Sequence, residues 1–278
     1  MGESMENNKK TIVITGASDG IGAYSARVLK GLGHNVIIVG RNKEKTIKLA
    51  REISCPYHIA DFSKLNEVKR LARELSNYPI INVLINNAGA VFDRRIETED
   101  GFEKTFQVNV LSQFLLTNLL IDKLCKSNAT VIQTTSMATN LFAKKFDIND
   151  IQTKNGYTPI KAYAHSKLCN VLFTKALNKR FYDKGLKSVA FEPGIPRTNF
   201  AQEGAWFFKI AYHSPLKYLF TISVKNSSKR MVRLAVGKEG KDFVSGEVYS
   251  NKNKYNVKCK DINKKVEIFW ALLQDMIK

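Results

Sequence analysis

Short runs of β-branched residues alternate with stretches of helical periodicity along most of this chain. The strand-like runs are TIVIT (11–15), NVIIVG (35–40), INVLINNAG (81–89), ATVIQTTS (129–136) and SVAFEPG (188–194). Helical stretches lie between them, and the longest are residues 102–124 and 162–184. Such alternation indicates βαβ units and a parallel sheet covered by helices on both faces. We therefore predict an α/β protein with a doubly wound, three-layer parallel sheet.

The alternation runs from Thr11 to Gly194 without a linker, so we predict a single domain with its core at about residues 10–200. Residues 195–246 are irregular and rich in aromatic residues. A short strand, EVYS (247–250), is expected to close the sheet, and the C-terminal strand and helix fill residues 247–278.

The stretch 204–220 is expected to form a mobile apolar lid over a substrate. Its aromatic residues are Trp206, Phe207, Phe208, Tyr212, Tyr218 and Phe220. With Lys209 and Lys217, the same stretch also fits peripheral contact with a membrane surface. Ordinary core packing is the third interpretation.

The net charge of +19 raises the question of an anionic partner. The basic residues are scattered, with the densest patch at 251–260, so we expect no nucleic-acid partner. The first ten residues are polar and no apolar run approaches the ~20 residues of a membrane span, so we expect a cytoplasmic protein without a secretory signal. The four cysteines lie far apart, and we predict no metal site.

A glycine-rich turn, TGASDGIG (15–22), joins the first strand to the first helix. Gly16 permits the tight turn, Gly20 permits close approach of a phosphate, and Gly22 lets the helix pack on the strand. Backbone N–H groups at the helix start can then bind the pyrophosphate of a dinucleotide. A structural turn without a ligand is the alternative. Ser18, Asp19 and Ile21 complete the predicted cofactor contacts in this turn.

The residues after the second strand indicate which dinucleotide is bound. An acid there binds the ribose 2′-hydroxyl of NAD, whereas an arginine suits the 2′-phosphate of NADP. The sequence is VIIVGRNKEK, so Arg41 follows Gly40 and no acid ends the strand. We predict NADP(H) as the cofactor. Asp19 argues mildly against it, and a plain surface role for Arg41 is the alternative.

The stretch AYAHSK (162–167) places Tyr163 four residues before Lys167, on one face of a helix. Reduction of a carbonyl needs a proton donor near its oxygen. A phenol has a pKa of about 10, and a nearby ammonium lowers it by favouring the phenolate. We predict Tyr163 as general acid in reduction and general base in oxidation, with Lys167 tuning it. Ser136 can donate to the substrate oxygen. A solvated surface pair is the alternative for Tyr163 and Lys167.

Several motifs occur in a fixed order: TGASDGIG, Asp61 after the third strand, NNAG (86–89), Asn109 in FQVNV, Ser136 in TTSMA, YAHSK and PGIPRT (193–198). Together they resemble the short-chain dehydrogenase/reductase family over about residues 10–200. GRN after the second strand, the long gap from Ser136 to Tyr163, SKLCNVLFTKAL and PGIPRT look more closely like the retinol-dehydrogenase-like branch, which includes WW-domain-oxidoreductase-like proteins.

That resemblance implies a Rossmann fold, NADP(H) and an apolar alcohol or carbonyl substrate of the retinoid, steroid or lipid-aldehyde class. It implies that Asn109 helps hold a proton-relay water and that Lys167 also binds the nicotinamide ribose. Asp61 would touch the adenine, or else cap the helix beginning near Lys64. Asn109 could instead be a helix-interior polar group. The remaining implied cofactor contacts are Asn87, Gly89, Pro193, Gly194 and Thr198, with a simple strand-ending turn as the alternative for NNAG.

Glu192 departs from the family pattern, because relatives often carry His or a small residue before Pro-Gly. We expect it either to shape substrate polarity or to form a surface ion pair. The helix containing Tyr163 is expected to be exposed and available for pairing in a homodimer. The alternative function is a catalytically weak nucleotide-sensing or scaffold protein of the same fold.

Overall fold

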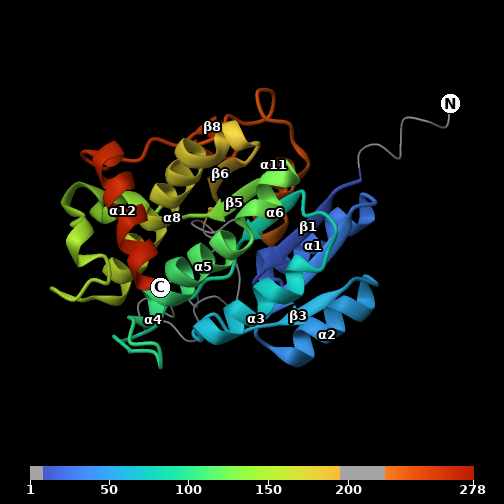
Figure 1. The fold of residues 1–278 in the computed structure, drawn as a ribbon, viewed down its shortest axis with the longest axis horizontal. Coiled ribbons are helices and arrows are strands. Elements are labelled where there is room, and N and C mark those ends of the chain that lie inside the picture. Colours follow the sequence, from blue (N-terminus) through green and yellow to red (C-terminus); the bar gives the residue numbers. More distant parts are fainter. Residues whose placement is uncertain (1–8, 195–222) are drawn as a thin grey trace.

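The computed structural model describes residues 9–194 and 223–278, whose strands form an eight-stranded sheet in the order β3-β2-β1-β4-β5-β6-β7-β8 (Figure 1). The strands are β1 Thr11–Thr15, β2 Asn35–Gly40, β3 Tyr57–Ile59, β4 Val83–Asn86, β5 Thr130–Thr134, β6 Lys187–Glu192, β7 Val248–Ser250 and β8 Asn253–Lys254. All neighbours pair in parallel except β7 and β8, which are antiparallel. The prediction of a doubly wound α/β sheet is confirmed.

Helices cover both faces of this sheet. The longer ones are α1 Gly20–Gly31, α2 Lys43–Glu52, α3 Leu65–Ser76, α5 Ser112–Leu119, α8 Pro159–Phe181, α11 Val224–Val236 and α12 Ile262–Met276. Side chains alternate between the faces, so Val13 packs with α3, α5, α8 and α12, while Ile12 and Ile14 pack with α1, α2 and α11. The chain order reverses between β1 and β4, and this switch point places a crevice at the carboxyl ends of the central strands.

The single helix expected over 102–124 is wrong. The structure has α4 Lys104–Phe106, a π-helical turn Gln107–Leu111, then α5, a break at Leu120 and α6 Ile121–Lys126. Helix α4 begins at Lys104 because Glu103 is its N-cap: the Glu103 carboxylate accepts hydrogen bonds from the N–H groups of Thr105 and Phe106. A π-turn adds one residue to the helical repeat, which changes the direction of the side chains around Asn109.

The C-terminal part also differs from expectation. Residues 224–236, expected to be irregular, form α11, which packs against α1 on the sheet. The sheet ends with β8 rather than with residues 247–250. The expected lid segment 204–220 lies outside the described residues, and within 9–194 and 223–278 no helix combines the length and apolar character that crossing a bilayer requires.

The expectation that α8 is exposed is wrong. Its residues from Ala164 to Thr174 are all buried, because α8 is packed between strands β5 and β6, helices α4 and α7 (Thr139–Phe142), and α12, which lies beside it in Figure 1. Phe173 and Phe114 meet Trp270 with ring centroids 6.5 and 5.0 Å apart. The Glu267 carboxylate of α12 pairs with Arg180 at the end of α8. The C-terminal helix α12 therefore covers part of α8, and pairing in a homodimer stays a prediction.

Candidate active site

A cavity of about 440 Å³ opens at the carboxyl ends of the central strands. It brings together almost all the residues proposed from the sequence. These are Gly16, Ser18, Asp19, Gly20, Ile21, Gly22, Arg41, Asp61, Asn87, Gly89, Ser136, Tyr163, Lys167, Pro193 and Gly194. Asn109 lies behind the wall, and Thr198 lies outside the described residues. The individual roles stay predictions.

The glycine turn leaves no room for larger residues at Gly16. This residue has φ +66°, and a Cβ built on it would lie 2.7 Å from Ala88 Cα. Asn87 holds the turn by donating from Nδ2 to the carbonyls of Thr15 and Gly16, at 3.0 and 3.2 Å. NNAG is therefore both the turn that ends β4 and the support for the glycine turn.

Positive charge collects at the end of the cavity beside β2. Arg41 and Lys45 both line it, and Lys45 Nζ lies 2.8 Å from the Asp19 carboxylate. The same carboxylate accepts from Gly20 N–H and caps α1. Lys45 thus compensates the charge of Asp19, the feature that weighed against a 2′-phosphate.

Lys167 stands against the ring of Tyr163 in the cavity wall. Its Nζ lies 5.6 Å from the ring centroid and donates to the Thr134 carbonyl at 3.0 Å. The side chain is only 3% exposed, and this burial lowers the pKa of Lys167 to about 8. A buried cation therefore lies beside the ring of the half-buried Tyr163, as the prediction that Lys167 tunes this tyrosine requires.

Asn109 joins the catalytic helix to the loop after β4. Its Oδ1 accepts from Ala90 N–H at 2.8 Å, and its Nδ2 donates to the Ala90 carbonyl and to Ser166 Oγ, both at 3.0 Å. Ser166 in turn donates to the Tyr163 carbonyl. These bonds span 19 and 57 residues of sequence, so the alternative of a purely local helix-interior bond is wrong.

The hydroxyls that follow β5 have different partners. Thr135 is buried and donates to the Lys167 carbonyl at 2.8 Å, which holds α8 against the strand. Ser136 Oγ accepts from Ala138 N–H at 3.2 Å, a bond that leaves its own hydrogen available to a substrate oxygen. The preference for Ser136 over Thr135 as the substrate-facing hydroxyl therefore has a geometric basis.

Asp61 does not cap the helix beginning near Lys64. Its carboxylate accepts from Ser63 N–H and Ser63 Oγ, and the first free N–H of α3, that of Leu65, donates instead to Asp100. The N-cap interpretation is wrong because Asp61 turns back on its own loop at the cavity wall.

Glu192 is not on the surface. It is 1% exposed and its carboxylate accepts from Arg230 and Ser250, so the expected surface ion pair is a buried one. His165 is also buried, and its Nδ1 lies 3.0 Å from Thr153 Oγ1. Burial lowers the pKa of His165 to about 4 and keeps the ring neutral near pH 7.

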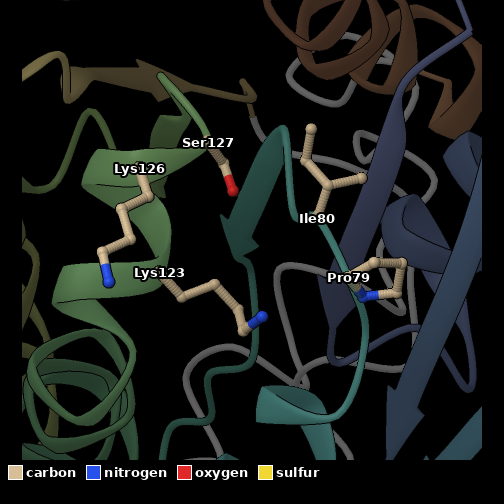
Figure 2. Close-up of a pocket in the computed structure, with 5 residues that line it drawn as sticks. All are labelled: Pro79, Ile80, Lys123, Lys126 and Ser127. Atoms are coloured by element: carbon tan, nitrogen blue, oxygen red, sulfur yellow. The ribbon is translucent and has the colours of Figure 1, made fainter.

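Sequence reasoning missed several wall residues: Lys45, Phe62, Val91 and Val108. Only Lys45 had a signal, since it is a basic residue in the first turn of the helix that follows Arg41. A smaller hollow of about 300 Å³ lies before β4 and β5, at the opposite edge of the sheet. In Figure 2 the Lys123 side chain extends toward the loop with Pro79 and Ile80, and its Nζ donates to the Tyr78 carbonyl. The Lys123 ammonium in this hollow is therefore bound to the loop that precedes β4.

The cavity fits a dinucleotide. Its wall continues from Arg41 and Asp61, past the start of α1, to Tyr163 and Gly194. The glycine turn supplies backbone N–H groups suited to a pyrophosphate, and Arg41 and Lys45 supply charge suited to a further phosphate. Its volume lies within the range of about 300–1,000 Å³ typical of small-molecule sites.

Comparisons with known proteins agree with this geometry. The model of the short chain dehydrogenase family matches residues 10–205. Human retinol dehydrogenase 13 is 34% identical over 86% of this chain and 76% of its own length. Human polyprenol dehydrogenase is 33% identical over 73% of this chain and 65% of its own length. The crystal structure of an uncharacterized protein from Mycobacterium paratuberculosis is 26% identical, with a TM-score of 0.75 over 100% of this chain and 98% of that chain.

Proposed function

Since the chain belongs to the short-chain dehydrogenase family, whose members are oxidoreductases, we propose that it uses NADP(H) to interconvert a hydrophobic alcohol and its aldehyde or ketone, with Tyr163 as acid and base. The alcohol–carbonyl chemistry follows from the family and its retinol-dehydrogenase-like branch. Support for Tyr163 as the acid and base comes chiefly from Lys167, a buried ammonium beside the Tyr163 ring in the wall of the cavity.

In reduction, the carbonyl carbon would receive a hydride from a nicotinamide held in the cavity and become the C–H carbon of the alcohol. Tyr163 donates its phenolic proton to the carbonyl oxygen, and Ser136 donates a hydrogen bond to the same oxygen as negative charge develops. The Lys167 ammonium stabilises the phenolate that remains. In oxidation the phenolate removes the alcohol proton instead.

NADP(H) is preferred in this proposal because of the charge beside β2. Arg41 follows β2 and lines the cavity, where an arginine suits a 2′-phosphate, and Lys45 compensates Asp19. Guanidinium–phosphate contacts are among the stronger hydrogen-bonded pairs in proteins. A ribose 2′-hydroxyl gains little from the same cations.

A hydrophobic substrate is supported by the relatives and by the wall. Retinol and polyprenol, the alcohols in the relatives' names, are both apolar. Val91 and Val108 line the cavity together with Tyr163. These two side chains give the part of the wall near Tyr163 apolar surface, which suits the body of an apolar alcohol or carbonyl.

The proposal is tested by titrating the protein with NADPH and NADH and then measuring turnover of retinaldehydes, steroids and medium-chain aldehydes. We expect tighter binding of NADPH and turnover of at least one apolar carbonyl. Binding of neither nucleotide would refute the proposal, whereas tight binding without turnover throughout the panel would favour the nucleotide sensor or scaffold.

The cofactor preference has its own matched pair of variants. Arg41→Ala should weaken NADPH binding by about tenfold, the effect of losing one charged hydrogen bond, and leave NADH binding nearly unchanged. Arg51→Ala removes the same charge from the exposed last turn of α2 and should change neither affinity. Equal loss of both nucleotides in Arg41→Ala would contradict the assignment of Arg41 to the 2′-phosphate.

A further inference from the structure

Glu192 ends β6 immediately before Pro193 and Gly194, the turn that forms one wall of the cavity. Its Oε2 accepts from Gly194 N–H at 2.7 Å. Gly194 has φ +79°, a left-handed conformation that a glycine adopts without strain. The carboxylate therefore fixes the shape of the turn from the side that faces away from the cavity.

The second oxygen of Glu192 is held from two other elements. Its Oε1 accepts from the guanidinium of Arg230 on α11 and from Ser250 Oγ on β7. The same nitrogen of Arg230 donates to the Glu192 backbone carbonyl at 2.8 Å. The side chains of Glu192 and Arg230 are only 2% and 18% exposed, so water screens this pair weakly.

Helix α11 also reaches the opposite wall of the cavity. Ser228 Oγ donates to the carbonyl of Ile21, in the first turn of α1 beside the glycine turn. One helix thus contacts the glycine turn through Ser228 and the Pro193–Gly194 turn through Arg230. Helix α11 therefore links the two walls through these side-chain contacts.

We propose that Glu192 and Arg230 are positioning residues, a buried ion pair that holds the Pro193–Gly194 turn in place to receive the dinucleotide. This role rests on the proposed function, because it acts on binding of the same cofactor. It replaces both sequence-based expectations for Glu192: the carboxylate points to α11 and β7 rather than toward a substrate, and the ion pair is buried.

The first test is Glu192→Gln. A carboxylate accepts at both oxygens, but a glutamine has one oxygen and one NH₂ group, so it cannot accept from Arg230 and from Gly194 N–H together. We expect the Kd for NADPH to rise about tenfold, as for loss of one charged hydrogen bond, and the KM for NADPH to rise with it. Since the pair acts on positioning rather than on proton transfer, kcat should fall less than KM rises.

The second test separates an effect on NADPH binding from a loss of folding stability. Removing one partner of a buried pair leaves an unpaired charge, whereas replacing both with apolar residues often preserves stability. The double variant Glu192→Leu with Arg230→Met should therefore keep a Tm near that of the wild type and still bind NADPH about tenfold more weakly. Glu267→Gln is the control, because it weakens a more exposed Arg–Glu pair between α8 and α12, away from the cavity walls.

The outcomes separate cleanly. Weaker NADPH binding in both Glu192 variants, with unchanged affinity in Glu267→Gln, supports the positioning role. A lower Tm with unchanged NADPH affinity in the Glu192 variants refutes it and leaves the pair a purely structural contact. Failure of the wild type to bind NADPH is a different result, which refutes the proposed function itself.

Discussion

Replacing Lys167 with methionine is expected to stabilise the nucleotide-free protein while removing its activity. The folded protein lowers the pKa of Lys167 from 10.5 to about 8, because the ammonium is buried. At about 1.4 kcal/mol per pKa unit, burying this charge costs on the order of 3 kcal/mol at neutral pH. Loss of the bond to the Thr134 carbonyl offsets about 1 kcal/mol of the gain, although Asn170 still donates to that carbonyl. The expected net gain is about 2 kcal/mol, or a rise in Tm of roughly 5 °C for a domain of this size.

The pH dependence makes this prediction specific to the lysine charge. Below pH 8 both the folded and the unfolded wild type carry the Lys167 ammonium, so the full cost is present. As pH rises from 8 to 10.5 the folded protein loses the proton first, and the wild type recovers stability relative to Lys167→Met. Thermal denaturation of both proteins across this range measures the difference in Tm. A difference that is constant with pH, or a variant less stable than the wild type at pH 7, would refute the reasoning.

Two further predictions concern the glycine turn and the buried histidine. Gly16→Ala should destabilise the fold by more than about 1 kcal/mol and abolish NADPH binding, because the residue has a left-handed conformation and its Cβ would lie 2.7 Å from Ala88 Cα. Gly33→Ala is the control: Gly33 also has a positive φ, but its Cβ would meet no atom, so this variant should bind NADPH as the wild type does. Thermal denaturation and NADPH titration of both variants test this. Burial lowers the pKa of His165 to about 4 in the folded protein, against 6.5 in the unfolded chain. As pH falls from 6.5 to 4, the free energy of unfolding of the wild type should therefore fall by up to roughly 3 kcal/mol relative to that of His165→Gln. Urea unfolding of both proteins at each pH measures this, and a difference in unfolding free energy that does not change with pH would contradict the prediction.

Much of the candidate site could be predicted because its residues follow strand ends. Parallel strands bring their carboxyl ends to one edge of the sheet, so TGASDGIG, Arg41, NNAG and Ser136 converge once the strands are recognised. The spacing of Tyr163 and Lys167 is local to one helix and needs no knowledge of tertiary structure. These are the features that periodicity and turn chemistry specify.

The remaining features depend on contacts distant in sequence. Glu192 meets Arg230 and Ser250, which are 38 and 58 residues away, so its burial could not be read from its neighbours. The π-turn at 107–111 shifts the helical repeat by one residue inside a segment that is buried on all sides, where periodicity carries no signal. Likewise, the packing of α12 on α8 depends on the contact of Trp270 with Phe173, which lies about 100 residues earlier in the chain, and local sequence pattern does not encode such a contact.

The measurement that tests the central claim most directly compares the wild type with Tyr163→Phe, using NADPH titration and steady-state reduction of an apolar aldehyde that the wild type accepts. The phenol is the proposed proton donor, and phenylalanine keeps the ring that contacts Lys167. We predict a nearly unchanged Kd for NADPH and a loss of turnover of at least about a hundredfold, the lower end for general acid catalysis. Turnover within a few-fold of the wild type, with NADPH bound normally, would contradict the account.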